Sequence, residues 1–211
     1  MIPRRRMLEV FAASAAGLSL LRSRVEAAVL PPTPEQTAGP FYPQWFPADT
    51  DNDLVHVAGR SGTARGTVTQ IGGRILDPDG RPLSGVRVEI WQCDANGRYH
   101  YVRDDRTAPP PDENFQGYGQ TTTDGAGGYQ FRTIRPVPYP GRTPHIHFAV
   151  SGPGIPRFIT QMYVAGEPQN EGDGVLMGVR DPAARARLIV PLRPVTETPG
   201  ALSGTFDIVL G

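Results

Sequence analysis

The sequence contains no lysine, so each of its 21 basic residues is an arginine. Acidic residues also number 21, and the formal net charge of zero gives no sign of a surface for nucleic acid or another polyanion. Cys93 is the only cysteine, which excludes an intramolecular disulfide. Because Cys93 follows a β-like run, we expect it to be a small buried apolar residue.

Long hydrophobic runs are also missing, so we expect no stable membrane span. Residues 1–27 combine a basic start, a short apolar stretch and small residues, which is the layout of a secretory signal peptide. Arg4 and Arg5 fit the pair of a twin-arginine signal, with an ordinary Sec signal or an uncleaved anchor as alternatives. We expect cleavage after Ala27 and export to the periplasm or beyond the cell, through the twin-arginine route.

Glycine (25 residues) and proline (23 residues) are abundant, which argues against long helices and favours short strands joined by turns. Residues 28–65 are rich in proline and aromatic residues, so they predict an extended N-terminal arm laid over the core. Disorder is the alternative, but the four aromatic side chains of this arm are too apolar for a solvated tail; they are Phe41, Tyr42, Trp45 and Phe46.

Residues 66–211 predict one all-β domain, a β-sandwich of two sheets with long loops and one short helix. Strands are expected at 67–77, 85–92, 117–124, 128–134, 144–152, 157–166 and 205–210. The glycine-rich segment 125–128 resembles a hairpin connection. The helix is expected from Asp181, a suitable N-cap that is followed by Pro182.

Two of the four histidines, His145 and His147, lie one residue apart in a predicted strand. Alternate residues of a strand point to the same face, so both imidazoles can bind one metal ion. Tyr99 and Tyr139 lie in turn-rich contexts, and phenolates combined with imidazoles suit Fe(III) better than Zn(II). Tyr101 competes with Tyr99, because the two would share a face in a strand.

The other two histidines, His56 and His100, have no matching role and are expected to be surface or turn residues. Arg142 precedes the histidine pair by three residues, and on its own it would be read as a surface arginine. Gln161 on its own would be expected only to satisfy backbone groups.

These residues occur within longer matching segments, and here the sequence resembles the intradiol ring-cleavage dioxygenases. The resemblance covers nearly all of residues 28–211, and it is closest to the protocatechuate 3,4-dioxygenase branch. It is carried by "TPEQTAGPFYP", "GVRVEIWQCDANGRYHY", "ENFQGYGQTTTDGAGGYQFRTIRPVPYP", "GRTPHIHFAVSG" and "TQMYVAGEPQNEGDGVLMGVRDP". The catechol and hydroxyquinol branches also carry an N-terminal helical dimerisation domain, which nothing here would form.

The resemblance implies one Fe(III) per chain, held by two tyrosines and two histidines. Tyr99 and Tyr139 match the equatorial and axial tyrosinates, and His145 and His147 match the axial and equatorial histidines. It further implies catalytic roles for Tyr139, Arg142 and Gln161, with Arg142 stabilising negative charge on the ring. A substrate-binding pocket wall is implied for Gly39, Pro40, Trp91 and Val175.

The implied reaction splits a catechol-type ring between its two hydroxyls with O₂ and gives a cis,cis-muconate-type diacid. The branch carries a longer insert between its axial tyrosine and the arginine; here only two residues separate Tyr139 from Arg142. We therefore expect a shallower, more open site, and protocatechuate is not carried over as the substrate. Branch members pair two different chains, whereas this chain has all ligand positions and is expected to act alone or as a homo-oligomer.

Two other classes of protein remain as alternatives. The segments "GGRILDPDGRPLSGVRVEIW" and "TTTDGAGGYQFRTI" also resemble non-catalytic transthyretin-like, carboxypeptidase-regulatory-like binding modules. Such modules lack the set of two tyrosines and two histidines. A zinc hydrolase using the same histidines would need a carboxylate base beside the pair, and tyrosines are poor zinc ligands.

Overall fold

A computed structural model describes residues 29–103 and 109–211 of the chain. The predicted signal peptide at residues 1–27, including Arg4, Arg5 and the expected cleavage site, lies outside the described residues. Among the described residues, the helices are too short to cross a membrane.

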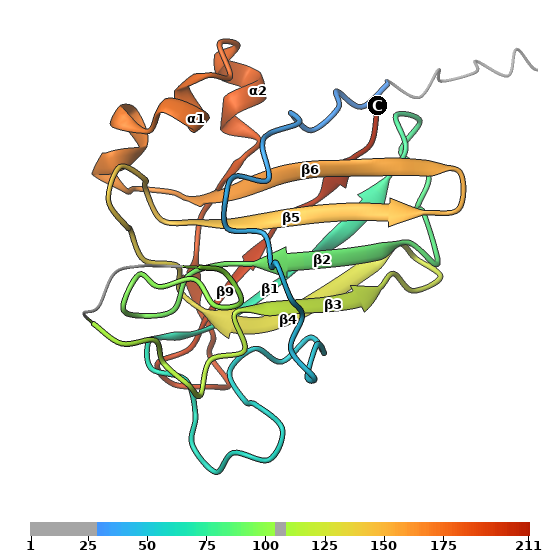
Figure 1. The fold of residues 1–211 in the computed structure, drawn as a ribbon. Coiled ribbons are helices and arrows are strands. Elements are labelled where there is room, and N and C mark those ends of the chain that lie inside the picture. Colours follow the sequence, from blue (N-terminus) through green and yellow to red (C-terminus); the bar gives the residue numbers. More distant parts are fainter. Residues whose placement is uncertain (1–28, 104–108) are drawn as a thin grey trace, which may run out of the picture.

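The described residues form two five-stranded sheets that pack face to face (Figure 1). The first sheet consists of β1 (Val68–Leu76), β4 (Gly128–Ile134), β8 (Arg193–Pro194), β9 (Leu202–Thr205) and β10 (Ile208–Val209). In this sheet β1 pairs antiparallel with β4 and parallel with β9 and β10. The other has the order β3-β2-β5-β6-β7; its strands are β2 (Arg87–Trp91), β3 (Tyr118–Thr122), β5 (His145–Gly152), β6 (Ile155–Val164) and β7 (Ile189–Val190). The predicted all-β sandwich is confirmed.

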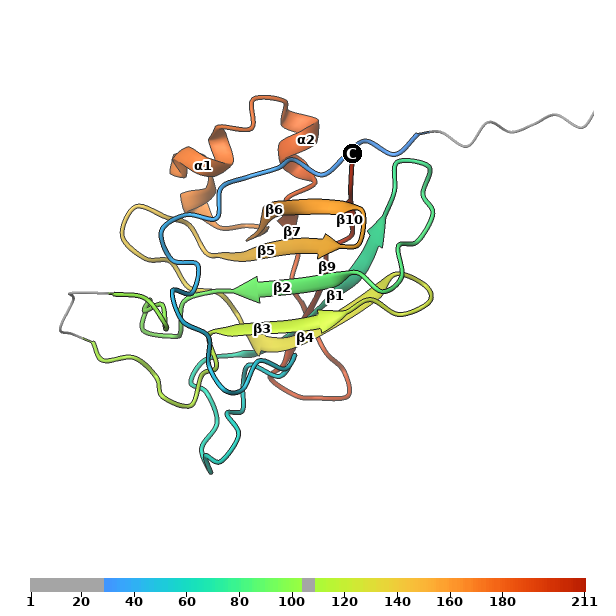
Figure 2. The ribbon, with the colours of Figure 1, turned by 45° about the vertical axis from the view of Figure 1, so that its right-hand side comes forward.

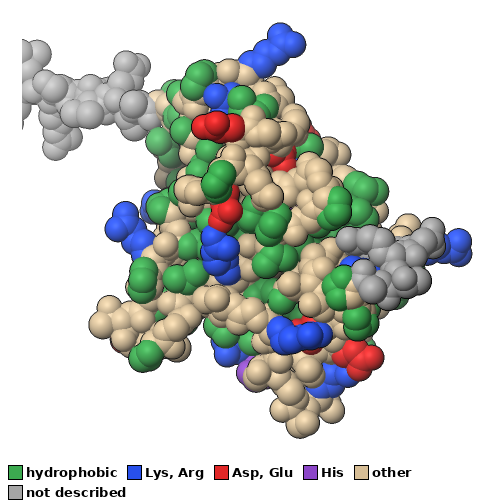
Figure 3. Space-filling model, turned by 90° about the vertical axis from the view of Figure 1, so that its left-hand side faces the viewer, with side chains coloured by type: hydrophobic (Ala, Val, Ile, Leu, Met, Phe, Trp, Pro, Cys, Tyr) green, Lys and Arg blue, Asp and Glu red, His purple; other side chains and the backbone are tan. Residues whose placement is uncertain are grey.

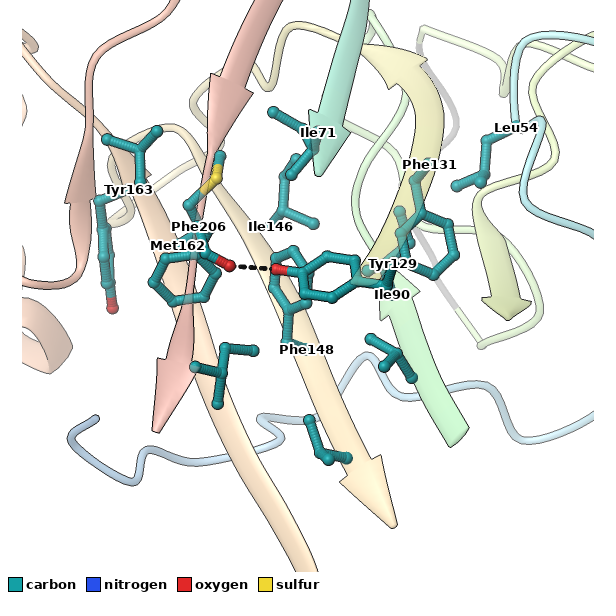
Figure 4. Packing of buried hydrophobic residues seen from close by; sticks show 14 of the residues in the cluster. Leu54, Ile71, Ile90, Tyr129, Phe131, Ile146, Phe148, Met162, Tyr163 and Phe206 are labelled. Atoms are coloured by element: carbon teal, nitrogen blue, oxygen red, sulfur yellow. Dashed lines mark hydrogen bonds between the residues drawn. The ribbon is translucent and has the colours of Figure 1, made fainter. Parts of the chain in front are cut away.

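Apolar side chains from the facing sides of the two sheets fill the core (Figure 4). Ile146, Phe148 and Val150 alternate along β5 and point inward, as the two-residue period of a strand requires. Tyr129 brings a hydroxyl into this core, and it donates a hydrogen bond to the carbonyl of Phe206. The interior is therefore apolar with its buried phenol satisfied.

The helices are short and lie at one end of the sandwich (Figure 1). The predicted helix is present as α2 (Pro182–Ala186), and Asp181 caps it by accepting a hydrogen bond from the N–H of Ala183. The structure adds two single turns before it, the 3₁₀ turn η1 (Pro168–Gly172) and α1 (Gly174–Met177). These turns lie beside the loop that joins β4 to β5.

The arm crosses the outer face of the β3-β2-β5-β6-β7 sheet (Figure 2). Its first part follows the edge of β6, where the N–H of Gln36 donates to the carbonyl of Ile159 at 2.8 Å. Phe41 and Tyr42 then pack on the outer face, while Trp45 and Phe46 are about half exposed at 51% and 52%. The sheet is thus covered on both sides, by the core and by the arm.

One connection and one strand differ from what the sequence predicted. The strands on either side of residues 125–128 do not form a hairpin, because β3 pairs with β2 and β4 pairs with β1 in the other sheet. The predicted final strand at 205–210 is interrupted at Phe206 and Asp207. A Cβ at Gly73 would collide with the carbonyl of Phe206, so β9 and β10 pair with β1 on either side of this close approach.

Candidate metal centre and active site

The outer face of the sheet carries a row of three side chains in cross-strand register. Trp91 of β2 pairs with His147 of β5, which pairs with Gln161 of β6. The indole and imidazole rings stack with centroids 4.7 Å apart and planes 7° from parallel. His145 lies one pair further along, opposite Tyr163. As predicted, the two histidines share a face, and both are buried at 1% exposure.

Tyr99 and Tyr139 reach this face from two loops. Tyr99 follows a turn closed by Asp94, whose Oδ1 accepts hydrogen bonds from the N–H groups of Asn96 and Arg98. Its ring stacks on Phe41 of the arm, with centroids 4.6 Å apart. The arm and this loop together hold the Tyr99 phenol inside the protein.

Tyr139 opens a tight turn, Tyr139-Pro140-Gly141-Arg142, that ends just before β5. The N–H of Arg142 donates to the carbonyl of Tyr139 at 2.9 Å, and Gly141 has φ +82. Proline followed by a glycine of positive φ is the pattern of a type II turn. This turn places the phenol of Tyr139 beside the guanidinium of Arg142, at 3.4 Å.

Four donor atoms converge where these elements meet. Nε2 of His145 lies 3.1 Å from Nε2 of His147 and 3.4 Å from the hydroxyl of Tyr99. The ring of Tyr139 lies next to both Tyr99 and His145, with centroids 5.5 Å from the Tyr99 ring and 5.4 Å from the His145 ring. Two nitrogens each about 2.1 Å from one ion, at right angles, would be about 3.0 Å apart, so the imidazole spacing fits two ligands of a single metal.

The backbone fixes the orientation of His145. Its Nδ1 lies 2.6 Å from the carbonyl oxygen of Thr143, so Nδ1 carries the proton and donates it. The lone pair is then on Nε2, which faces the other three donors. Hydrogen bonding of the remote nitrogen is how proteins orient a metal-binding histidine.

Burial controls the charge of these groups. It is the main cause that lowers the pKa of His145 to about 4, with the nearby Arg142 guanidinium adding to the effect. Burial also holds the pKa of His147 well below its usual value, and His145 contributes. The same burial raises the pKa values of Tyr99 and Tyr139, although Arg142 lowers both. Without a metal, the site therefore favours neutral imidazoles and phenols.

The donor types suit a hard trivalent ion. Within the described ranges, no group of three or more His, Cys, Asp and Glu side chains is placed to hold a metal, so tyrosines complete the set. A bound ion lowers the pKa of a ligating phenol, which offsets the effect of burial. Nδ1 of His147 is buried without a hydrogen-bond partner, so Nε2 is the one ring nitrogen of His147 that faces another polar atom. The residues fit Fe(III) better than Zn(II).

Arg142 is held in a hydrogen-bond network beside the cluster of two tyrosines and two histidines. Its Nε donates to Asp173 at 2.8 Å, and one terminal nitrogen donates to Oε1 of Gln161 at 2.6 Å. Gln161 in turn donates to the carbonyl of Thr37 in the arm at 2.9 Å. Tyr163 donates to Gln161 at 3.0 Å. Hydrogen bonds thus fix the orientation of the Arg142 guanidinium, which is not free in solvent.

A cavity of about 480 Å³ opens beside Tyr139 and Arg142. Turn residues and the η1–α1 segment form its wall; they are Pro138, Tyr139, Pro140, Gly141, Arg142, Thr143, Gln169, Gly172 and Asp173. Figure 3 shows the end of the molecule to which these loops contribute, where charged side chains are scattered between hydrophobic ones.

The four residues predicted to line the pocket lie on different parts of this region. Gly39, with φ +64, approaches His147 so closely that a Cβ there would lie 3.7 Å from Cε1 of the ring. Pro40 follows it and is exposed. The indole of Trp91 stacks on the imidazole of His147, and Val175 in α1 is partly exposed. Gly39 and Trp91 lie against His147, and none of the four residues is part of the wall of the 480 Å³ cavity.

The competition between Tyr99 and Tyr101 is decided by backbone geometry. The segment is not a strand, and Tyr101 has φ 62, so the two side chains do not share a face. His100, expected at the surface or in a turn, lies in a bend and is partly buried, and its Nε2 lies 3.2 Å from Asp94. His56 is exposed, as expected. Cys93 is buried, and its thiol lies 3.5 Å from the carbonyl of Val137.

Sequence reasoning missed several residues that shape the site. Asp173 anchors Arg142, Thr143 orients His145, and Phe41 covers Tyr99. The acidic residue before an apolar run in "GDGVL" carries an N-cap signal that would have located Asp173. Its link to Arg142 depends on the fold, and no local pattern contains it.

Comparison with known proteins agrees with this geometry. A family model described as "Dioxygenase" matches residues 37–211. The protocatechuate 3,4-dioxygenase beta chain of Burkholderia cepacia is 41% identical over 169 residues, which cover 76% of this chain and 71% of the relative. A hydroxyquinol 1,2-dioxygenase from Corynebacterium glutamicum is 32% identical, over 57% of this chain and 44% of the relative.

Among solved structures, the dioxygenase domain of a dioxygenase carbohydrate-binding protein fusion from Streptomyces sp. SirexAA-E is similar, with a TM-score of 0.65 and 32% identity. The match covers 85% of this chain and 98% of that domain. An intradiol ring-cleavage dioxygenase from Tetranychus urticae has a TM-score of 0.68 at 23% identity, which supports the fold.

The chain belongs to the intradiol ring-cleavage dioxygenase family. It is therefore an enzyme of this class rather than a non-catalytic transthyretin-like module or a zinc hydrolase. The chain spans less than half the length of the Corynebacterium hydroxyquinol dioxygenase, at 44%.

Proposed function

We propose that this protein is an Fe(III)-dependent dioxygenase that cleaves a catechol-type ring between its two hydroxyls with O₂, giving a cis,cis-muconate-type diacid. One Fe(III) per chain would be held by Tyr99, Tyr139, His145 and His147. The observation that carries the proposal is the convergence of two imidazole nitrogens and the Tyr99 hydroxyl at one buried point, with the Tyr139 ring beside them.

The two tyrosines would have different tasks. Tyr99 is buried and stacked on Phe41, so its phenol is the more fixed of the pair. Tyr139 is only partly buried and lies at the cavity wall. With a metal ion bound, Tyr139 would be a phenolate, and we assign to its oxygen the uptake of a proton from a catechol hydroxyl, which would return Tyr139 to the neutral phenol.

Arg142 would stabilise negative charge on the bound ring. Its guanidinium lies 3.4 Å from the Tyr139 hydroxyl and is held by Asp173 and Gln161, so it needs no rearrangement during the reaction. Fixed charges in a water-poor site stabilise transition states more effectively than mobile ones. The bound metal would supply the electron-withdrawing centre that makes the catechol ring reactive towards O₂.

The test is a visible spectrum and metal analysis of the purified protein, before and after catechol is added without oxygen. We expect about one iron per chain, a tyrosinate-to-Fe(III) charge-transfer colour and a shift of that colour with catechol. Admission of O₂ should then yield the ring-opened diacid, detected by mass spectrometry. A protein that stays colourless after Fe(III) reconstitution would refute the proposal.

We also propose that the protein is exported through the twin-arginine route, on the sequence of residues 1–27. Full-length protein with Arg4→Lys and Arg5→Lys together should remain inside the cell, while unaltered protein is recovered outside the inner membrane. Equal distribution of both forms would contradict this. We further propose that the substrate is a catechol and that no particular substituent on its ring is required.

We also propose that the chain acts alone or as a homo-oligomer, because all four proposed metal ligands come from one chain.

A further inference from the structure

Asp173 lies between η1 and α1 and is a buried acidic group in the wall of the cavity beside the candidate site. Its residue is 1% exposed, and its carboxylate accepts hydrogen bonds from four N–H groups. Asp173 has so far been described only as a contact of Arg142, and the effect of this carboxylate on turnover has not been assigned. A buried charge with a full set of donors is expensive to desolvate and indicates a specific task.

The two carboxylate oxygens of Asp173 have separate partners. Oδ1 accepts from the backbone N–H groups of Val175 and Leu176, each at 3.0 Å, and so caps α1. Oδ2 accepts from the backbone N–H of Thr143 at 3.0 Å and from Nε of Arg142 at 2.8 Å. Three backbone groups therefore fix the carboxylate, and the fourth donor is the arginine side chain.

The Arg142 guanidinium is thereby anchored from one side. Nε is directed at Asp173, while the terminal nitrogens face Gln161 at 2.6 Å and Tyr139 at 3.4 Å. The guanidinium is planar, so fixing Nε also fixes the direction of both terminal groups. The neighbouring cavity, lined by both Arg142 and Asp173, leaves room for an unanchored side chain to turn away.

We infer that Asp173 is the positioning residue that holds the Arg142 guanidinium against Tyr139 and the metal-binding side chains. This inference rests on the proposed function, because it assumes that Arg142 acts on the bound ring. Asp173 itself lies behind Arg142 and acts only through it. The ion pair is buried, with side-chain exposures of 14% for Arg142 and 0% for Asp173, so solvent screens it little.

The first test is Asp173→Asn. The amide keeps the size of the carboxylate, but whichever way it is turned, its NH₂ group faces either the N–H groups of α1 or those of Thr143 and Arg142. Loss of a charge-assisted hydrogen bond of this kind predicts a fall in kcat of roughly 10- to 100-fold, with KM changed much less. Asp181→Asn is the matched control, because Asp181 also caps a short helix but is exposed.

The second test is a double-mutant cycle. If Asp173 acts through Arg142, adding Asp173→Asn to Arg142→Ala should lower kcat by less than about threefold more. Full multiplication of the two single losses would show that Asp173 acts independently, and the inference would be overturned. Kinetics of Asp173→Asn within about twofold of the unaltered enzyme would overturn it as well.

A readout on the iron-free protein separates this inference from the proposed function. The NMR signal of the Arg142 Nε–H, assigned by its loss in Arg142→Ala, should exchange with water at least about tenfold faster in Asp173→Asn than in Asp181→Asn. An unchanged exchange rate overturns the inference even if the protein cleaves catechols. Faster exchange in a protein that cleaves no catechol supports the anchoring and refutes the proposed function.

Discussion

The two faces of β5 are equally buried and chemically opposite. On the inner face, Ile146, Phe148 and Val150 are 0% exposed and pack in the core. On the outer face, His145 and His147 are 1% exposed beneath the arm. The difference lies in what covers each face: a second sheet covers one, and an arm and loops carrying hydroxyl, amide and guanidinium groups cover the other.

This comparison separates two uses of burial. On the inner face, burial removes apolar area from water and stabilises the fold. On the outer face, burial depresses the pKa values of two imidazoles and raises those of two phenols, so it tunes the chemistry of the site at a cost in stability. Substitutions on the two faces should therefore give different kinds of loss.

The largest expected effect is on the outer face. His147→Ala removes one of the four proposed metal ligands and should abolish iron binding and turnover while the fold remains. Metal analysis, visible absorption and circular dichroism together check this. Tyr139→Phe is the companion variant, which should keep iron, change the colour and slow turnover. Stoichiometric iron and full activity in His147→Ala would show that the ligand assignment is wrong.

On the inner face, Phe148→Ala should cost about 3–5 kcal/mol of unfolding free energy, because it leaves a cavity in the core. Urea unfolding followed by tryptophan fluorescence measures the loss. Phe46→Ala is the control, since that ring is 52% exposed, and it should cost well under half as much. Equal losses for the two variants would break the distinction between the faces.

Acid should destabilise the folded protein through His145 on the outer face of β5. The pKa of His145 is lowered to about 4 in the folded protein, from an unfolded value near 6.5. The unfolded chain therefore binds a proton before the folded one does, so stability is present above about pH 6.5 and falls as the pH drops towards 4.

The loss from His145 alone should be about 3 kcal/mol between those pH values in the iron-free protein. Urea unfolding at a series of pH values measures it. His145→Gln should reduce the slope of the profile in this window without abolishing it, because burial also depresses the pKa of His147. A profile in His145→Gln identical to that of the unaltered protein would disprove the assignment.

The smallest effect concerns the cover of the outer face. Tyr42 of the arm donates a hydrogen bond to the buried carboxylate of Glu89 at 3.0 Å. Tyr42→Phe should cost about 1 kcal/mol, since Glu89 keeps its bonds from Tyr118 and Arg87. Limited proteolysis should cut the arm faster in this variant. An unchanged cutting rate would mean that packing alone holds the arm.

Local patterns predicted much of the sheet and part of the site. The two-residue period of a strand places His145 and His147 together, and Asp181 caps its helix as expected. The roles of Tyr99 and Tyr139 came from the family resemblance. Residue spacing alone left Tyr99 and Tyr101 equal, because it does not reveal the positive φ at Tyr101 that separates them.

Long-range partners could not be predicted in this way. The turn after β3 has the residues of a hairpin, yet its two strands pair in different sheets, because pairing depends on the core faces of both strands. The anchoring of Arg142 by Asp173 joins residues 31 positions apart. Such contacts arise only when the sandwich closes.

The covering arm also sets an order of events during synthesis. Thr37 receives its hydrogen bond from Gln161, 124 residues later in the chain, and Pro34 receives one from Thr160, 126 residues later. The arm leaves the ribosome before β5 and β6, so it has no surface to dock on until they follow. Contacts of such separation form late and slowly. The cover over the candidate site is therefore synthesised before the strands that it covers, and it closes last.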